Sequence, residues 1–198
     1  MDRHLVVGLG NPEPRYLNNR HNVGFMVVDH LADAERIDVS RSKFKGLFGT
    51  GRVADVPAVL LKPQTFMNLS GRSVAPARAF FDVDLENVLV VHDEIDLPFG
   101  TLRLKIGGGH AGHNGLRSMV GELGGNGFVR LRVGVGRPQH GAVADYVLSD
   151  FDNEESQWLP DLLDRACEAV RATLVDGPRR AMNQTNTKSD TQESSNRG

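Results

Sequence analysis

The feature that most constrains the fold is a continuous apolar run, VLVV at residues 88–91, which polar residues follow directly. Such a run is typical of a strand that is buried on both faces at the centre of a sheet. Shorter apolar or alternating segments predict further strands at residues 5–7, 45–52, 59–62, 102–106 and 129–135. Because helical patterns separate these strands, we predict an α/β fold with a twisted mixed β-sheet flanked by helices.

Apolar residues spaced by three and four positions predict helices at residues 22–34, 70–81, 114–123 and 154–174. Pro76 is expected to kink the second helix or to delay its start. The chain length fits one domain, which we place at residues 1–178. Residues 179–198 are almost entirely polar and predict a flexible C-terminal tail.

The composition narrows the class of protein. The formal net charge of −2 excludes a uniformly basic surface, so any site for anions must be local. The single cysteine, Cys167, can form neither an internal disulfide nor a multi-cysteine zinc site, which favours a cytoplasmic protein. The N-terminal residues resemble a strand of the fold more than a signal peptide, and no transmembrane segment is expected.

Polar segments rich in glycine and asparagine follow several predicted strands, where open α/β sheets bind ligands. The first begins at Gly8 like a dinucleotide fingerprint, but Glu13 occupies the position of the third glycine. A carboxylate would face a pyrophosphate unfavourably, so a nucleotide site is the weaker interpretation. His21 lies near a predicted helix start and is either an acid–base group or a capping or core histidine.

The second and third polar segments each allow two interpretations. In KPQTFMNLSG (residues 62–71), Phe66 and Met67 either pack on the core or form an apolar wall, and Asn68 either caps a helix or offers its amide to a ligand. Asp93 is the first of three carboxylates after the central strand. These carboxylates could orient a histidine, bind a metal or remain solvated.

The fourth segment, residues 107–115, contains five glycines among nine residues. So much backbone freedom indicates close approach to a ligand, a mobile lid or a long turn. His92, Asp93, His110 and His113 could together hold a metal ion. This is the weaker interpretation because a glycine-rich loop holds ligands poorly and because the chain has no HExxH helix.

Basic residues gather in one part of the sequence. Between positions 100 and 140 there are six lysines and arginines against one acidic residue. Arg103 and Lys105 alternate on one predicted strand, as do Arg130 and Arg132 on another. Two adjacent strands of this kind would form either a cationic patch for a phosphate or a solvated face.

Five blocks occur in order: GLGNP with a following Tyr and RHNVGF, then KPQTFMNLSG, HDEIDLPFG, RLKIGGGHAGHNGLRS and RLRVGVGRP. Together they resemble the signature blocks of bacterial peptidyl-tRNA hydrolases, from Leu5 to about Leu174. The chain departs from the family pattern at Glu13, Asn19 and Ala111. The resemblance implies a monomeric, cytoplasmic α/β esterase that needs no metal or other cofactor. It implies that the substrate is peptidyl-tRNA released prematurely from ribosomes, and that the products are free tRNA and peptide.

The resemblance also implies roles for individual residues. His21 corresponds to the general base that activates a water molecule, and Asp93 to the carboxylate that holds this base. The implied substrate-binding residues are Asn11, Tyr16, Phe66, Asn68, Asn114, Arg103, Lys105 and Arg132. Among these, the asparagines surround the scissile ester, the aromatic residues line the groove for the acceptor end and the peptide, and the basic residues meet the 5′ phosphate of the tRNA.

Three alternatives remain open from the residues themselves. A non-catalytic RNA-binding module would share the basic patch but would have no use for a histidine held by a carboxylate. A metal hydrolase acting on another ester or amide would lose activity with a chelator. A nucleotide-dependent enzyme would be stabilised by its nucleotide.

Overall fold

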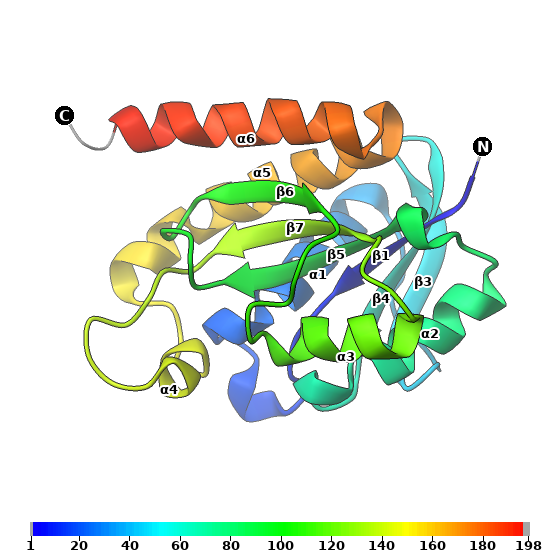
Figure 1. The fold of residues 1–198 in the computed structure, drawn as a ribbon, viewed down its shortest axis with the longest axis horizontal. Helices are drawn as coiled ribbons and strands as arrows, with labels where there is room; N and C mark the ends of the chain where they lie inside the picture. The colour runs from blue at the N-terminus through cyan, green and yellow to red at the C-terminus, as the bar shows by residue number, and fades with distance from the viewer. Residues whose placement is uncertain (1, 196–198) are drawn as a thin grey trace.

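The computed structural model describes the backbone of residues 2–195 and the side chains of residues 2–186. Its centre is a seven-stranded mixed sheet with the order β2-β3-β4-β1-β5-β7-β6 (Figure 1). The strands are β1 (His4–Gly8), β2 (Arg41–Lys43), β3 (Gly46–Val53), β4 (Val56–Pro63), β5 (Val88–Glu94), β6 (Leu102–Ile106) and β7 (Val129–Gly134). Strands β4, β1, β5 and β7 run parallel, while β2, β3 and β6 pair antiparallel. The predicted α/β fold with a mixed sheet is therefore confirmed.

Helices cover both faces of the sheet. They are α1 (Val23–Glu35), α2 (Gly71–Phe80), α3 (Asn114–Leu123), α4 (Val143–Val147), α5 (Asn153–Asp176) and α6 (Pro178–Ser195). Helices α1 and α5 pack on one face, and α2 and α3 on the other (Figure 1). Over the part of the chain that the structure describes, no helix is long and apolar enough to cross a membrane.

The side chains of the central strands point alternately to the two faces of the sheet and contribute to an apolar core on each face. On β1, Leu5 and Val7 join the cluster beneath α2 and α3, whereas Val6 joins the cluster beneath α1 and α5. Successive side chains of a strand point to opposite faces, so a central strand must be apolar at every position. This requirement explains the continuous apolar run of β5, which is buried from Val88 to Asp93.

The C-terminal segment differs from the flexible tail predicted for residues 179–198. Residues 178–195 form α6, which lies along the β6 edge of the sheet (Figure 1); residues 196–198 lie outside the described part. Ala181 is fully buried, and the Asn186 amide pairs with both backbone groups of Leu104, at 2.9 Å to its N–H and 3.2 Å to its carbonyl. The Asn186 side chain thus pairs with the backbone N–H and carbonyl of one residue on the edge strand β6. Polar composition alone does not reveal such a pairing.

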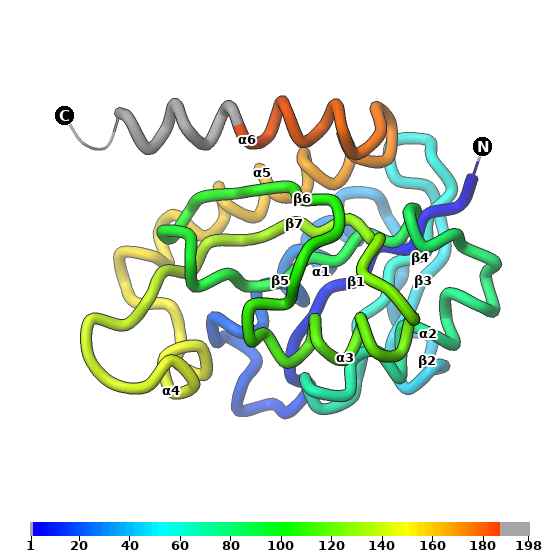
Figure 2. Tube along the Cα trace, viewed as in Figure 1, coloured from blue at the N-terminus to red at the C-terminus, as the bar shows by residue number. Residues whose placement is uncertain are grey.

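The parallel strands bring the polar segments together, because their carboxyl ends meet at one edge of the sheet. The loop after β1 carries Asn11, the loop after β4 carries Phe66 and Asn68, and β5 ends with Asp93. The loop from β6 to α3 crosses the sheet towards the same edge (Figure 2).

Candidate active site

Two glycines allow α1 to begin directly against the ends of β1 and β5. A Cβ atom on Gly24 would lie 2.4 Å from a backbone oxygen of β5, and one on Gly8 would lie 2.2 Å from the carbonyl oxygen of Gly24. Any side chain at either position would push the helix away from the sheet. This close approach brings His21, in the 3-10 turn before α1, against Asp93 at the end of β5.

Arg20 anchors the turn that carries His21. Its guanidinium pairs with Glu155 at 2.6 Å and donates to the Ser149 hydroxyl at 2.6 Å and to the Asp150 carbonyl at 2.8 Å. The Arg20 side chain is only 7% exposed. No sequence pattern singles out Arg20, because its partners lie about 130 positions away along the chain.

The Asp93 carboxylate joins two histidines. Its Oδ2 atom lies 2.8 Å from Nδ1 of His21, and its Oδ1 atom lies 2.8 Å from Nε2 of His113. Burial by itself raises the pKa of Asp93, but the two histidines outweigh this effect and hold that pKa well below its ordinary value. Asp93 is therefore a charged carboxylate that is almost completely shielded from solvent.

The α3 helix fixes which nitrogen of His113 carries the proton. His113 is the N-cap of α3, and its Nδ1 accepts from the backbone N–H groups of Gly115 at 3.2 Å and Leu116 at 3.3 Å. A ring nitrogen that accepts two hydrogen bonds uses its lone pair, so the proton resides on Nε2 and is donated to Asp93. Sequence reasoning considered His113 only as a metal ligand and missed this arrangement.

Asp93 also orients His21. The Nδ1–H of His21 donates to the carboxylate, which leaves Nε2 as the nitrogen available for base chemistry. Burial lowers the pKa of His21, but the charge of Asp93 and its hydrogen bond act in the opposite direction, and the net pKa lies above the ordinary value. His21 therefore accepts a proton more readily than a free histidine does.

His92 supports Asp93 from within the core. Its ring is 1% exposed, and its Nδ1–H donates to the Asp93 carbonyl at 2.8 Å. Burial, followed by the neighbouring His113, lowers the pKa of His92 to about 3. This neutral ring lies edge-on to His113, with 5.1 Å between the ring centroids. His92 thus fills the space behind the two polar residues without adding a charge.

Two adjoining cavities contain the three predicted asparagines. The first, of about 350 Å³, has a lining that includes His21, Asp93, His113, Asn11 and Asn114, with further polar residues and several apolar ones. The second, of about 520 Å³, shares Asn11 and Asn114 and adds Asn68 and Phe66. The structure therefore places these predicted site residues around two neighbouring cavities with shared walls, and we call the two cavities together the hollow.

Asn22 holds Asn11 at this hollow. The Asn11 N–H donates to Oδ1 of Asn22 at 2.6 Å, and the Asn22 amide donates to the Asn11 carbonyl at 2.9 Å. Oδ1 of Asn11 accepts from the N–H of Glu13 at 3.2 Å. Among the described residues, the side-chain N–H groups of Asn11 have no protein partner, so they can donate to a ligand. Sequence reasoning did not single out Asn22, although it directly follows His21.

Tyr16 lies apart from these cavities. It ends a short 3-10 turn and lines neither cavity, and the Arg15 guanidinium stacks over its ring at 4.6 Å. Glu13, the departure from the family pattern, forms an ion pair with Arg15 at 2.9 Å. The extra carboxylate thus has a partner on its own loop.

The predicted basic residues lie on the β6–β7 pair. Arg103 is opposite Arg132 in the strand register. Arg132 donates to Glu94 at 2.8 Å, and Arg103 donates to the Asn186 carbonyl at 3.0 Å. Lys105 is exposed. The patch therefore combines one exposed lysine with two arginines that protein groups hold in place.

Arg130 does not belong to this patch, although the sequence pattern included it. It is 3% exposed, and its two terminal nitrogens donate to the carbonyls of Gly108 and Gly109. Asn126 adds a third bond, to the Gly108 carbonyl at 3.1 Å. The glycine-rich loop is therefore tied down over β7 where it crosses the sheet (Figure 2).

A metal site at this centre is disfavoured by the hydrogen bonds. His21, Asp93 and His113 offer ligand atoms within 4.8 Å of one another. However, Nε2 of His113 carries a proton, because its Nδ1 already accepts from the start of α3. A protonated nitrogen has no lone pair for a metal. His110, another predicted ligand, instead accepts from the N–H of Gly112 at 3.1 Å.

Comparisons with known proteins show which family the chain is similar to. The model of the peptidyl-tRNA hydrolase family matches residues 5–194. The chain is 55% identical over 187 residues to the peptidyl-tRNA hydrolase of Sorangium cellulosum, covering 93% of this chain and 84% of that protein. It is 53% identical over 184 residues to the Geobacter sulfurreducens enzyme, covering 93% and 95%. The crystal structure of the Acinetobacter baumannii enzyme superposes with a TM-score of 0.86 at 42% identity, covering 92% and 94%.

Proposed function

The chain belongs to the peptidyl-tRNA hydrolase family, and on that premise we propose that it hydrolyses the ester bond of peptidyl-tRNAs released prematurely from ribosomes. The products are free tRNA and a peptide. The observation that carries this proposal is the His21–Asp93 contact at 2.8 Å beside a cavity lined with asparagines. This arrangement suits hydrolysis of an activated ester without a metal.

His21 acts as the general base. Its Nε2 takes a proton from a water molecule while the water oxygen attacks the ester carbonyl. The imidazolium that forms is stabilised by the charged Asp93, and its proton passes to the departing ribose oxygen. General-base help of this kind accelerates a reaction by about 10²- to 10⁴-fold.

An asparagine stabilises the charge that develops on the carbonyl oxygen. Asn68 and Asn114 both line the hollow around the site, and either amide supplies a neutral N–H donor. A single donor of this type is typically worth about 3 kcal/mol of transition-state stabilisation. The remaining asparagine anchors the substrate.

Asn11 distinguishes peptidyl-tRNA from ordinary aminoacyl-tRNA. Its side-chain N–H groups are available, and the backbone of Asn11 is fixed by Asn22. The peptide of the true substrate offers a carbonyl to these donors, whereas a free amino acid offers a charged ammonium group. A site built for a hydrogen bond strongly rejects an analogue that lacks the partner.

The tRNA lies on the basic side of the site. Arg103, Lys105 and Arg132 hold the 5′ phosphate of the acceptor stem by charge rather than by base sequence. Tyr16 and the exposed Phe66 flank the 3′ end and the peptide. These contacts position the ester at His21.

Hydrolysis of an N-blocked aminoacyl-tRNA tests this function. The wild type should release free tRNA with and without a chelator, and His21→Ala should lose at least about 100-fold in rate, as expected for a general base. A chelator-sensitive wild type would favour a metal hydrolase. Binding of tRNA without turnover, unchanged in His21→Ala, would favour a non-catalytic RNA-binding module.

A further inference from the structure

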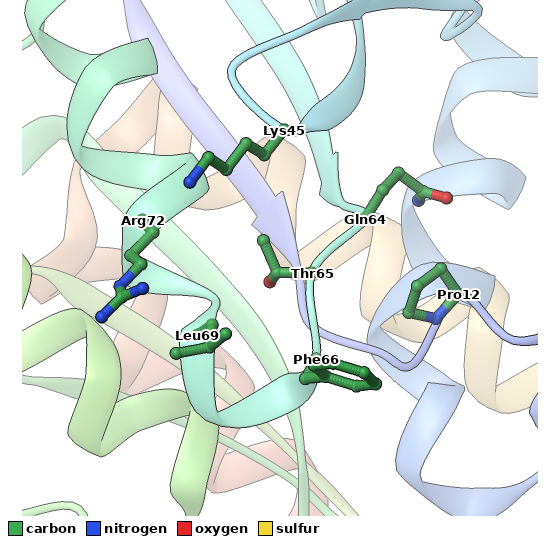
Figure 3. Close-up of a pocket in the computed structure, with 7 residues that line it drawn as sticks. All are labelled: Pro12, Lys45, Gln64, Thr65, Phe66, Leu69 and Arg72. Atoms are coloured by element: carbon green, nitrogen blue, oxygen red, sulfur yellow. The ribbon is translucent and has the colours of Figure 1, made fainter.

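A third cavity, of about 330 Å³, lies beyond Phe66 and shares Phe66, Leu69 and Arg72 with the neighbouring asparagine-lined cavity. Its lining residues are Pro12, Lys45, Gln64, Thr65, Phe66, Leu69 and Arg72 (Figure 3). We propose that this cavity binds an acidic side chain of the peptide, about three residues before the esterified residue. The proposal rests on the proposed function, because it extends the peptide path from the same site.

The charges at this cavity favour an anion. The charged ends of Lys45 and Arg72 lie on the same side of Thr65 (Figure 3). Among the described residues no carboxylate pairs with the Lys45 ammonium. Arg72 has only a loose contact, from its Nε to Glu122 at 3.6 Å, so its terminal nitrogens stay available. Within the described chain, one unpaired cation and one loosely paired cation at the same cavity attract a carboxylate.

The wall of the cavity includes a buried hydroxyl that pairs with no described residue. Oγ1 of Thr65 is shielded from solvent and has no hydrogen-bond partner among the described residues. A polar group in this state is costly unless a ligand satisfies it. Lys45 is held nearby, because its carbonyl accepts from the N–H of Gln64 at 2.8 Å. A carboxylate in the cavity could therefore accept hydrogen bonds from Lys45 and Arg72.

The position of the cavity in the sheet assigns it to the peptide rather than to the tRNA. Lys45 lies in the turn before β3, and β3 is the second strand from β1 in the order of the sheet. Lys105 lies on β6, which is the second strand from β5 on the opposite side of the sheet. His21 and Asp93 lie between them, at the ends of β1 and β5. With the tRNA phosphate at Lys105, the peptide leaves the ester in the opposite direction.

The spacing of the strands gives the distance along the peptide. Two strand intervals correspond to about 10 Å, and an extended chain covers this with about three residues. The walls formed by Pro12, Phe66 and Leu69 are apolar and suit the methylene groups of a glutamate. We therefore expect a glutamate three residues before the esterified residue to be preferred.

The test compares N-blocked pentapeptidyl-tRNAs that differ at one position. Glutamate, glutamine or lysine is placed two, three or four residues before the esterified residue, and kcat/KM is measured. With glutamate at the third position before it, kcat/KM should exceed that of the glutamine substrate about three- to tenfold, as expected for two partly exposed cations. Lys45→Gln or Arg72→Gln should reduce this preference, and the double variant should abolish it.

Two controls separate the outcomes. Lys43→Gln removes an exposed cation two positions away that instead contacts Phe44 and Phe80, and it should keep the preference. An N-blocked aminoacyl-tRNA is too short to reach the cavity, so Lys45→Gln should hydrolyse it at the wild-type rate. Equal rates for all pentapeptides would overturn the inference while leaving the proposed function intact. A higher KM for every substrate, the short one included, would show that the cavity binds RNA phosphate instead.

Discussion

The Nδ1 atom of His21 lies 2.8 Å from Oδ2 of Asp93, and this contact determines which ring nitrogen is free to act as a base. The same carboxylate accepts from His113, whose proton is fixed on Nε2 by the start of α3. Asp93 thus accepts from a donor on each of its oxygens. In Asp93→Asn an NH2 group replaces one carboxylate oxygen. This NH2 group would face the ring N–H of His21 or of His113, so that two hydrogen-bond donors would point at each other.

Asp93→Asn should therefore lower kcat by about 10³-fold, because the amide loses the charge and faces a ring N–H with its own donor. Activity needs neutral His21, so the wild-type kcat/KM should fall as the pH drops through the raised pKa of His21, above 6.5. Without Asp93 only the lowering effect of burial remains, and the acidic limb should move to lower pH. A pH–rate profile of both proteins checks this, and an unmoved limb would contradict the role of Asp93.

The buried His92 should make stability depend on pH. Its folded pKa of about 3 lies below the ordinary value of 6.5, so the unfolded chain binds the proton more readily between these values. The stabilising effect is present above pH 6.5 and is lost as the pH falls towards 3. The contribution of this group to the slope approaches about 1.4 kcal/mol per pH unit. Urea unfolding of His92→Gln should show a correspondingly flatter pH dependence than the wild type; parallel curves would contradict this assignment.

The sequence predicted helices best where apolar spacing and caps agree. Helix α3 occupies the predicted residues 114–123, because Leu116, Met119 and Leu123 share a buried face behind the His113 cap. In contrast, β2 consists of three exposed residues without alternating apolar and polar side chains. Helix α6 is polar, so it lacks the regular spacing of apolar residues that predicts a helix. Both depend on contacts with a neighbouring element rather than on their own composition.

The site was predictable in its residue types but not in its contacts. His21 and Asp93 are 72 positions apart, and only the family resemblance, not the spacing, linked them before the fold was known. The bridge to His113 depends on a backbone cap, and the anchor at Arg20 depends on α5. Contacts of this kind arise from tertiary packing, which a single sequence does not display.

Removing the anchor should cost much of the stability. Arg20→Ala leaves the partly buried Glu155 without its partner, and loss of one member of a buried pair typically costs about 3 kcal/mol or more. Arg15→Ala is the matched control, since Arg15 is 69% exposed and pairs with Glu13 on the same loop. That change should alter the unfolding free energy by less than about 0.5 kcal/mol. Similar losses in the two variants, measured by denaturant unfolding, would argue against an anchoring role.

Asn11→Asp should relax the discrimination between substrates. The remaining oxygen still accepts from the N–H of Glu13, so the loop keeps its conformation, but the donor becomes a carboxylate oxygen. A carboxylate attracts the ammonium group of free aminoacyl-tRNA and cannot donate to a peptide carbonyl.

The ratio of kcat/KM for blocked over free aminoacyl-tRNA should therefore fall by about tenfold or more in Asn11→Asp, as expected for one exchanged hydrogen bond. Asn68→Asp is the matched control, because Asn68 lines the adjoining cavity but not the one that contains His21. It should slow both reactions and leave their ratio unchanged. If Asn11→Asp also keeps the wild-type ratio, the selection between the two substrates must reside elsewhere in the site.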